Sequence, residues 1–225
     1  MKLNDFCNKV CWHEFSFGIS KNNHDVFLKK IENFTQEMQS RDQSSSYYSE
    51  NRKASFPKKD IEIGKYGEFA ASLALRCGKI TNEKFPILMP DFQVRTGGGK
   101  GWDCDLPFSQ VDTQFPNCHV KTCDQNTSDF VSRTRDNKYT WTFQYNNVSG
   151  IGGRDKLFST PNSDELILFM FVPNLHSKQA IFVASAPWNK IQGILKDPIA
   201  EKFKGLKKCV YSNDLMSLER SCKCI

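Results

Sequence analysis

The stretch from Leu166 to Val172 is apolar at every position, and it constrains the fold more than any other part of the chain. A strand that is apolar on both alternating faces belongs inside a sheet covered on both sides. An α/β architecture, in which helices flank a mixed sheet, meets this requirement. With this central strand at 165–172, other runs predict strands at 85–89, 102–108, 117–123, 139–146 and 179–185, and an edge strand at 207–211.

The spacing of apolar residues predicts a helix over 25–41, with Asp25 as its N-cap. A second helix is expected over about 61–77, capped by Asp60 and ended by Gly78. Its small residues suit close packing on a sheet; they are Gly67, Ala70, Ala71 and Ala74. A third helix is expected over 189–203, with a break at Pro198.

Composition divides the chain into two parts. The serine-rich, polar stretch 41–53 has no apolar periodicity and predicts a linker or a loop. We therefore expect residues 1–56 to form an N-terminal helical extension with this linker, and residues 57–225 to form the main folded domain. At 225 residues the chain is long enough to bury one good core.

Charge and cysteine content bear on partners and compartment. The net charge of +6 favours a polyanionic partner such as DNA. The chain has neither a long apolar run nor an apolar start, so we expect a soluble, cytoplasmic protein without a membrane partner. Nine cysteines in such a protein are expected to be free thiols. A structural Zn²⁺ site is a less favoured alternative, with the candidate ligands Cys7, Cys11, His13, Cys222 and Cys224.

Acidic residues and a lysine occur on consecutive predicted strands. Asp103 and Asp105 share one face of the strand at 102–108, and His119 and Lys121 share one face of the next. Glu68 lies upstream, in the helix over 61–77. Carboxylates beside a lysine are suited to hold a divalent cation next to a phosphodiester and to activate water. The pattern predicts a metal-dependent nuclease, although an exposed strand face with Lys121 as a salt-bridge partner remains an alternative.

These motifs resemble the PD-(D/E)XK nuclease superfamily over roughly residues 60–145. The helix signature is at 64–71, the acidic strand signature at 103–106 and the x-Val-Lys element at 119–121, in the order that the family uses. Asp91, which follows Pro90, is another candidate for the acid, but it has the setting of a turn residue. The resemblance implies a restriction-endonuclease-like core with a central mixed β-sheet flanked by helices.

The resemblance also implies an activity, that of a Mg²⁺-dependent DNA endonuclease of restriction type, which is a hydrolase. Mn²⁺ can substitute for Mg²⁺ in such an enzyme. Asp105, Asp103, His119 and the Val120 carbonyl would bind the metal, Lys121 would orient water and offset charge, and Glu68 would assist. His119 departs from the family pattern, which usually has an acid there. A neutral imidazole brings no negative charge to a metal site.

Contacts with DNA phosphates are predicted for basic residues near the motifs: Arg95, Lys100, Arg133, Arg135 and Arg154. The glycines at 97–101 precede a strand, not a helix, and therefore predict a hairpin turn instead of a phosphate-binding loop. Two other functions stay open: a nucleic-acid-binding protein on the same fold without catalysis, and an interaction protein organised by zinc. The sequence leaves the oligomeric state open, a homodimer included.

Overall fold

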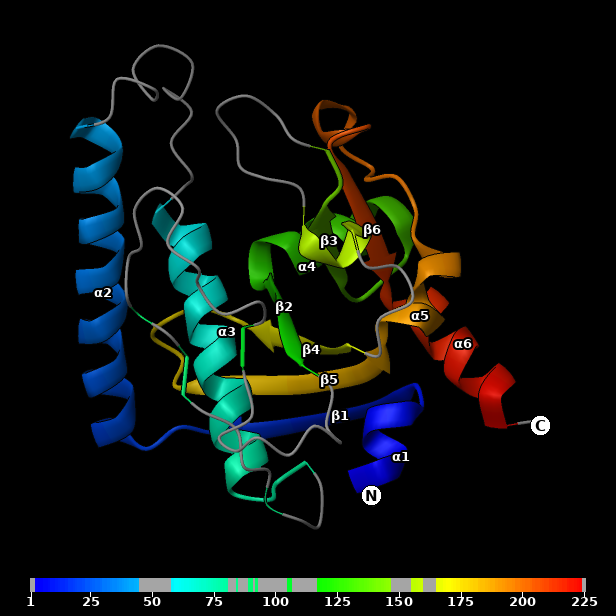
Figure 1. Ribbon diagram of the computed structural model, residues 1–225, viewed down its shortest axis with the longest axis horizontal. Helices are drawn as coiled ribbons and strands as arrows, with labels where there is room; N and C mark the ends of the chain where they lie inside the picture. Colours follow the sequence, from blue (N-terminus) through cyan, green and yellow to red (C-terminus); the bar gives the residue numbers. More distant parts are fainter. Residues whose placement is uncertain are drawn as a thin grey trace.

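A four-stranded mixed sheet forms the centre of the molecule (Figure 1). The computed structural model describes residues 3–44, 58–80, 84, 89–90, 92, 105–106, 117–146, 155–159 and 165–223. The strand order is β1 (Cys11–Gly18), β5 (Gln179–Pro187), β4 (Leu166–Val172) and β2 (Cys118–Asp124). β4 is parallel to β2 and antiparallel to β5. Every residue of β4 is buried, so the predicted central strand and the α/β class are confirmed.

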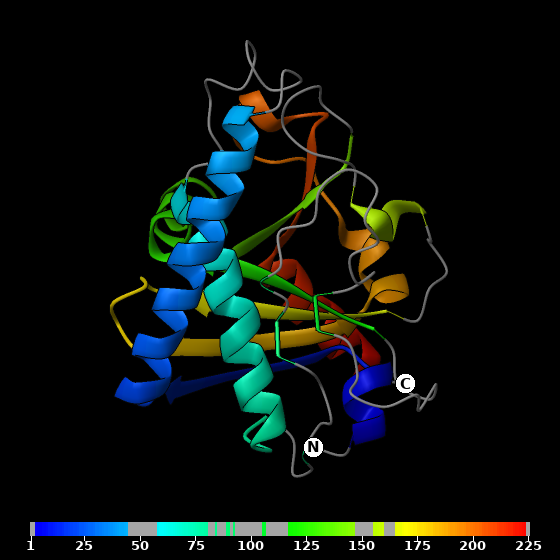
Figure 2. The same cartoon turned by 60° about the vertical axis from the view of Figure 1, so that its left-hand side comes forward.

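Helices cover one face of this sheet. They are α1 (Leu3–Asn8), α2 (Lys21–Ser44) and α3 (Lys58–Arg76). α2 and α3 lie side by side, as Figures 1 and 2 both show, and Phe27 of α2 stacks on Phe69 of α3. Alternate residues of the strands, such as Leu168 and Met170 of β4, complete this core.

A second layer covers the opposite face. β3 (Thr140–Gln144) pairs with β6 (Lys207–Tyr211) in an antiparallel ribbon, flanked by α5 (Trp188–Ile191) and α6 (Ser212–Lys223). The remaining elements are α4 (Gln125–Arg135) and the short helices η2 (Lys156–Ser159), η3 (Gln192–Ile194) and η4 (Glu201–Phe203). The sheet therefore lies between two apolar cores, one against the helices and one against the ribbon.

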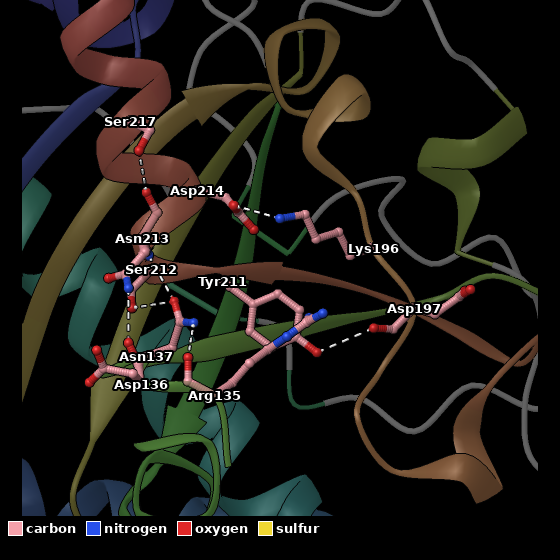
Figure 3. A network of polar contacts seen from close by, with 10 residues as sticks. All are labelled: Arg135, Asp136, Asn137, Lys196, Asp197, Tyr211, Ser212, Asn213, Asp214 and Ser217. Carbon is pink, nitrogen blue, oxygen red and sulfur yellow. Dashed lines mark hydrogen bonds and ion pairs between the residues drawn. The ribbon is translucent and has the colours of Figure 1, made fainter. Parts of the chain in front are cut away.

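A buried asparagine joins α4 to the start of α6 (Figure 3). Asn137 Oδ1 accepts hydrogen bonds from Ser212 Oγ at 3.3 Å and from the Asn213 backbone at 3.0 Å. Its Nδ2 donates to the Arg135 carbonyl at 3.0 Å. These bonds satisfy backbone groups at the two helix ends. They also fix the β3–β6 ribbon, because Asn137 precedes β3 and Ser212 follows β6.

Both long helices begin earlier than the sequence predicts. α2 starts at Lys21, because the preceding Ser20 accepts a hydrogen bond from the Asn23 backbone at 3.4 Å; Asp25 lies inside the helix and is not its cap. α3 starts at Lys58, so Asp60 is inside its first turn and not the cap. The predicted end of α3 is confirmed: Gly78 has φ 64°, and the next residue donates to the Ala74 carbonyl at 2.9 Å.

The helix predicted over 189–203 is wrong. α5 ends at Ile191, and the chain then runs beside β6, where Lys196 and Cys209 exchange backbone hydrogen bonds of 2.9 and 2.8 Å. Those bonds satisfy the backbone that a helix would otherwise satisfy. The predicted strand at 85–89 lies outside the described residues except for Met89, which is in no strand, and the strand at 102–108 is described only at 105–106.

The N-terminal part is more than the expected helical extension. β1 pairs with β5 as a full member of the sheet, and Phe6 of α1 is fully buried in the helix-side core. Polar linker residues 45–57 lie outside the described residues. In the part of the chain that is described, no helix is long and apolar enough to cross a membrane.

Gly67 brings α3 against β2, the strand that carries Lys121. A Cβ atom on Gly67 would lie 2.0 Å from Thr122 Oγ1, far inside contact distance. We expect Gly67→Ala to lower the free energy of unfolding by about 1–3 kcal/mol, because helix and strand must separate. Gly64→Ala on the same helix is the control, since no described atom would lie within 4 Å of its new Cβ. Urea unfolding of both variants checks this, and equal stabilities would contradict it.

Candidate active site

Lys121 lies on β2, at the end of the four-strand order in the described structure. Its ammonium is 5.0 Å from the centre of the Phe143 ring on β3, so the side chain points toward the ribbon layer. Lys121 Nζ lies 2.6 Å from Asp155 Oδ2, and both side chains are largely buried. β2 therefore places a cation between the sheet and the ribbon.

Asp105 lies directly beside the same strand. Its Oδ2 accepts a hydrogen bond of 2.7 Å from the Val120 backbone. Backbone bonds from Asp105 and Leu106 to the Cys118 carbonyl, at 3.1 and 3.0 Å, hold the short segment 105–106 against β2. The predicted neighbourhood of an acid and a lysine on adjacent segments is thus present for Asp105.

Glu68 approaches from α3, on the helix side of the sheet. It is only 9 % exposed and accepts a 2.8 Å hydrogen bond from Lys65. The pKa of Glu68 is raised to about 7: burial is the largest cause, the negative charge of Asp105 adds to it, and Lys65 and Lys121 oppose the rise. The Glu68 carboxyl is therefore electrostatically coupled to both Asp105 and Lys121.

Lys121 remains a cation despite its burial. Desolvation acts to lower the pKa of Lys121, but the charges of Asp155 and Asp105, the hydrogen bond to Asp155 and the charge of Glu68 more than offset it. The net effect is a raised pKa. The charges of three acids from separate segments thus act on one ammonium group.

His119, a predicted metal ligand, lies beside a carboxylate that the sequence analysis did not single out. Its Nε2 lies 2.8 Å from Glu165 Oε2, just before β4. The two atoms are close but not aligned for a hydrogen bond, and among the described residues neither has a hydrogen-bond partner. The metal-ligand role of His119 stays a prediction.

Several predicted site residues lie outside the described residues: Asp91, Arg95, Lys100, Asp103 and Arg154. Arg133 and Arg135 are in the last turn of α4. Arg133 donates to the Asp129 carbonyl at 3.1 Å, and the Arg135 guanidinium stacks 4.6 Å from the centre of the Tyr211 ring.

Among the described residues, no three His, Cys, Asp or Glu side chains are gathered closely enough to hold a metal ion. Neither Cys7 nor Cys11 is in a disulfide, and burial together with Cys11 raises the pKa of Cys7 to about 12. Of the other zinc candidates, Cys224 and the Cys222 side chain lie outside what the structure describes.

Comparisons with family models, with curated proteins and with solved structures found no match to this chain. The interpretation of the site therefore rests on its own residues.

Asp155 is the residue of this cluster that sequence reasoning missed. It is 34 positions from Lys121 along the chain and follows a glycine-rich stretch at 150–153. No motif marks it, and a polar residue before the apolar pair at 157–158 was the sole local signal.

Proposed function

We propose that this protein is a Mg²⁺-dependent nuclease that hydrolyses phosphodiester bonds in DNA. The observation that carries the proposal is the position of Glu68, Asp105 and Lys121. They come from a helix, a short segment and a strand; Asp105 accepts from the Val120 amide of β2, and the charges of Glu68, Asp105 and Lys121 act on one another.

The arrangement of elements also supports a restriction-endonuclease-like core. α3 packs on β2, β2 is followed by α4, and β4 lies parallel to β2. A helix between parallel strands is the usual crossover connection. Among the described residues, all side chains of the candidate site belong to the expected domain at 57–225. β1, from the N-terminal region, adds one strand to the sheet of this domain.

The donor chemistry of the site fits a hard divalent cation. Asp105 and Glu68 offer carboxylate oxygens, the ligand type that Mg²⁺ prefers, and their mutual repulsion favours a cation. The Val120 carbonyl, Asp103 and His119 are further ligands implied by the family resemblance. Bound there, Mg²⁺ or Mn²⁺ would act as a Lewis acid and lower the pKa of a water molecule.

The side chains have distinct roles in this proposal. Asp105 holds negative charge beside β2 and is oriented by the Val120 amide. Lys121 presents an ammonium that offsets the charge developing on the phosphate in the transition state. Glu68, with a pKa of about 7, can accept or give up a proton near neutral pH. DNA positioning falls to the basic residues and is favoured by the net charge of +6.

The direct test is incubation of the purified protein with supercoiled, linear and branched DNA in Mg²⁺, in Mn²⁺ and in a chelator. Cleavage that requires the metal supports the proposal. DNA binding without cleavage of any substrate would instead favour the alternative of an inactive nucleic-acid-binding protein, to which the lack of three gathered metal donors in the described part also points.

We expect Asp105→Asn to weaken Mn²⁺ binding about tenfold or more and to reduce cleavage accordingly. An asparagine keeps an oxygen that can accept from the Val120 amide, so the fold should be preserved while the charge is lost. Asp105→Ala removes both and should also destabilise the protein. Calorimetric Mn²⁺ titration with thermal unfolding separates these effects. Unchanged Mn²⁺ affinity in Asp105→Asn would move the site elsewhere.

A further inference from the structure

Asp155 is held more firmly than an ordinary loop residue. Its backbone amide donates to the Gln144 carbonyl at 2.8 Å, and its carbonyl accepts from Phe158 at 3.1 Å. The following Leu157 is fully buried in the ribbon-side core, and Phe158 packs edge-on against Trp188. The segment at 155–159 is therefore fixed by a backbone hydrogen bond to Gln144 and by the packing of Leu157 and Phe158.

The two carboxylate oxygens of Asp155 have separate partners. Oδ1 accepts from the Leu157 backbone at 3.4 Å, a local turn that orients the side chain. Oδ2 accepts from Lys121 at 2.6 Å. The carboxylate thus connects the fixed backbone after β3 to the ammonium on β2.

The other two acids near Lys121 have other contacts. Asp105 accepts from the Val120 amide, and Glu68 accepts from Lys65. Neither forms an ion pair with the ammonium in the described part of the structure, whereas Asp155 does. The Lys121 ammonium also lies 5.0 Å from the centre of the Phe143 ring, a favourable cation–π contact.

Stability is a poor explanation for this ion pair. The Lys121 and Asp155 side chains are only 18 % and 12 % exposed. At such burial the cost of removing two charges from water roughly cancels their attraction, and apolar replacements are often as stable. A charged pair in this place is better explained by a need for a fixed ammonium group.

We infer that Asp155 is a positioning residue of the proposed active site, which fixes the Lys121 ammonium between β2 and the β3–β6 ribbon for action on the phosphate. This inference rests on the proposed nuclease function for the reaction, but the fixing of Lys121 can be measured without it. A reactive group held within a fraction of an ångström contributes far more to rate than a loose one.

The first experiment measures the ion pair itself. In a proton–nitrogen correlation spectrum of ¹⁵N-labelled protein, an ammonium protected in a buried ion pair gives a resolved signal, whereas exposed lysines exchange too fast. We expect a Lys121 signal, assigned by its loss in Lys121→Arg, and its disappearance in Asp155→Asn. Asp155→Glu keeps a carboxylate and should restore the signal in part. A Lys121 signal unchanged in Asp155→Asn overturns the inference.

The second experiment measures turnover. We expect Asp155→Asn to lower kcat roughly tenfold to 100-fold with little change in KM, because Lys121 acts on the transition state. Asp155→Glu should recover part of the loss. The control is Asp214→Asn, which removes the 2.7 Å pair with Lys196 near the α6 start (Figure 3) and should leave kcat unchanged.

The outcomes separate the two proposals. A kcat of Asp155→Asn equal to that of wild type overturns the positioning role even if the nuclease is active. If wild type cleaves no DNA, the proposed function fails, and the ammonium signal still decides whether Asp155 fixes Lys121.

Discussion

Replacing Lys121 by methionine is expected to reduce DNA cleavage about 100-fold or more while DNA binding changes only a few-fold. Methionine keeps an unbranched apolar side chain, one heavy atom shorter than lysine, so the change removes mainly the charge that lies over the Phe143 ring. An ammonium that acts on the developing phosphate charge lowers the energy of the transition state more than that of the bound substrate. Single-turnover cleavage and a binding titration on the same DNA measure the two effects.

The same substitution is expected to destabilise the protein. Without Lys121, the buried Asp155 loses its partner and the neighbouring acids lose a compensating charge, at a cost of about 3 kcal/mol. Lys121→Met combined with Asp155→Asn should regain much of that stability without regaining cleavage. Lys196→Met, which breaks a more exposed pair with Asp214, is the control for both measurements. Cleavage by Lys121→Met within a few-fold of wild type would remove Lys121 from the mechanism.

The strands whose residues are mostly buried could be predicted, because their apolar runs leave a strong sequence signal. β4 is a continuous apolar run, and β2, β3 and β5 lie close to their predicted ranges. The β1 strand lies at the edge, where only Phe17 of its residues is buried, and it carries no such signal. Its place is set by backbone pairing with β5, which depends on residues far away in the chain.

Short helices were missed for a related reason. α6 is short, and among its described side chains Leu215 alone is both apolar and fully buried, so few apolar positions mark the helix in the sequence. Its start is set by Ser212 and Asn213, which bond to Asn137 on the other side of the ribbon. Such tertiary hydrogen bonds override local preference and cannot be deduced from spacing.

The candidate site likewise has residues that could be predicted from the sequence and residues that could not. Lys121 and Asp105 could be predicted because they lie on neighbouring segments and share a motif order. Asp155 could not, since its contact with Lys121 depends on how the chain returns after β3. Likewise, the strand period could not foresee Glu165 as the neighbour of His119. Periodicity predicts the face of a strand, whereas the partner is chosen by the tertiary fold.

The pH dependence of stability provides a test of the Glu68 environment. Burial and Asp105 raise the pKa of Glu68 from 4.5 to about 7, so the folded protein binds this proton more tightly than the unfolded chain. Glu68 should therefore lower the free energy of unfolding progressively as the pH rises from about 4.5 to 7. Above pH 7 its effect should stay constant. Since one pKa unit corresponds to about 1.4 kcal/mol, the full effect is on the order of 3 kcal/mol.

Glu68→Gln is expected to remove this loss, because a neutral amide is never ionised. The variant should match wild type in free energy of unfolding near pH 4 and exceed it by about 2–3 kcal/mol near pH 8. Any loss of the hydrogen bond from Lys65 to the Glu68 carboxylate would reduce this gain. Glu32→Gln, at an exposed position of α2, is the control and should shift stability by less than about 0.5 kcal/mol at either pH. Urea unfolding across this pH range measures all three proteins. Parallel curves for wild type and Glu68→Gln would mean that Glu68 is ionised without cost. A stability gain on removing this acid would show that Glu68 is kept at an energetic cost, as expected for a residue retained for chemistry and not for folding.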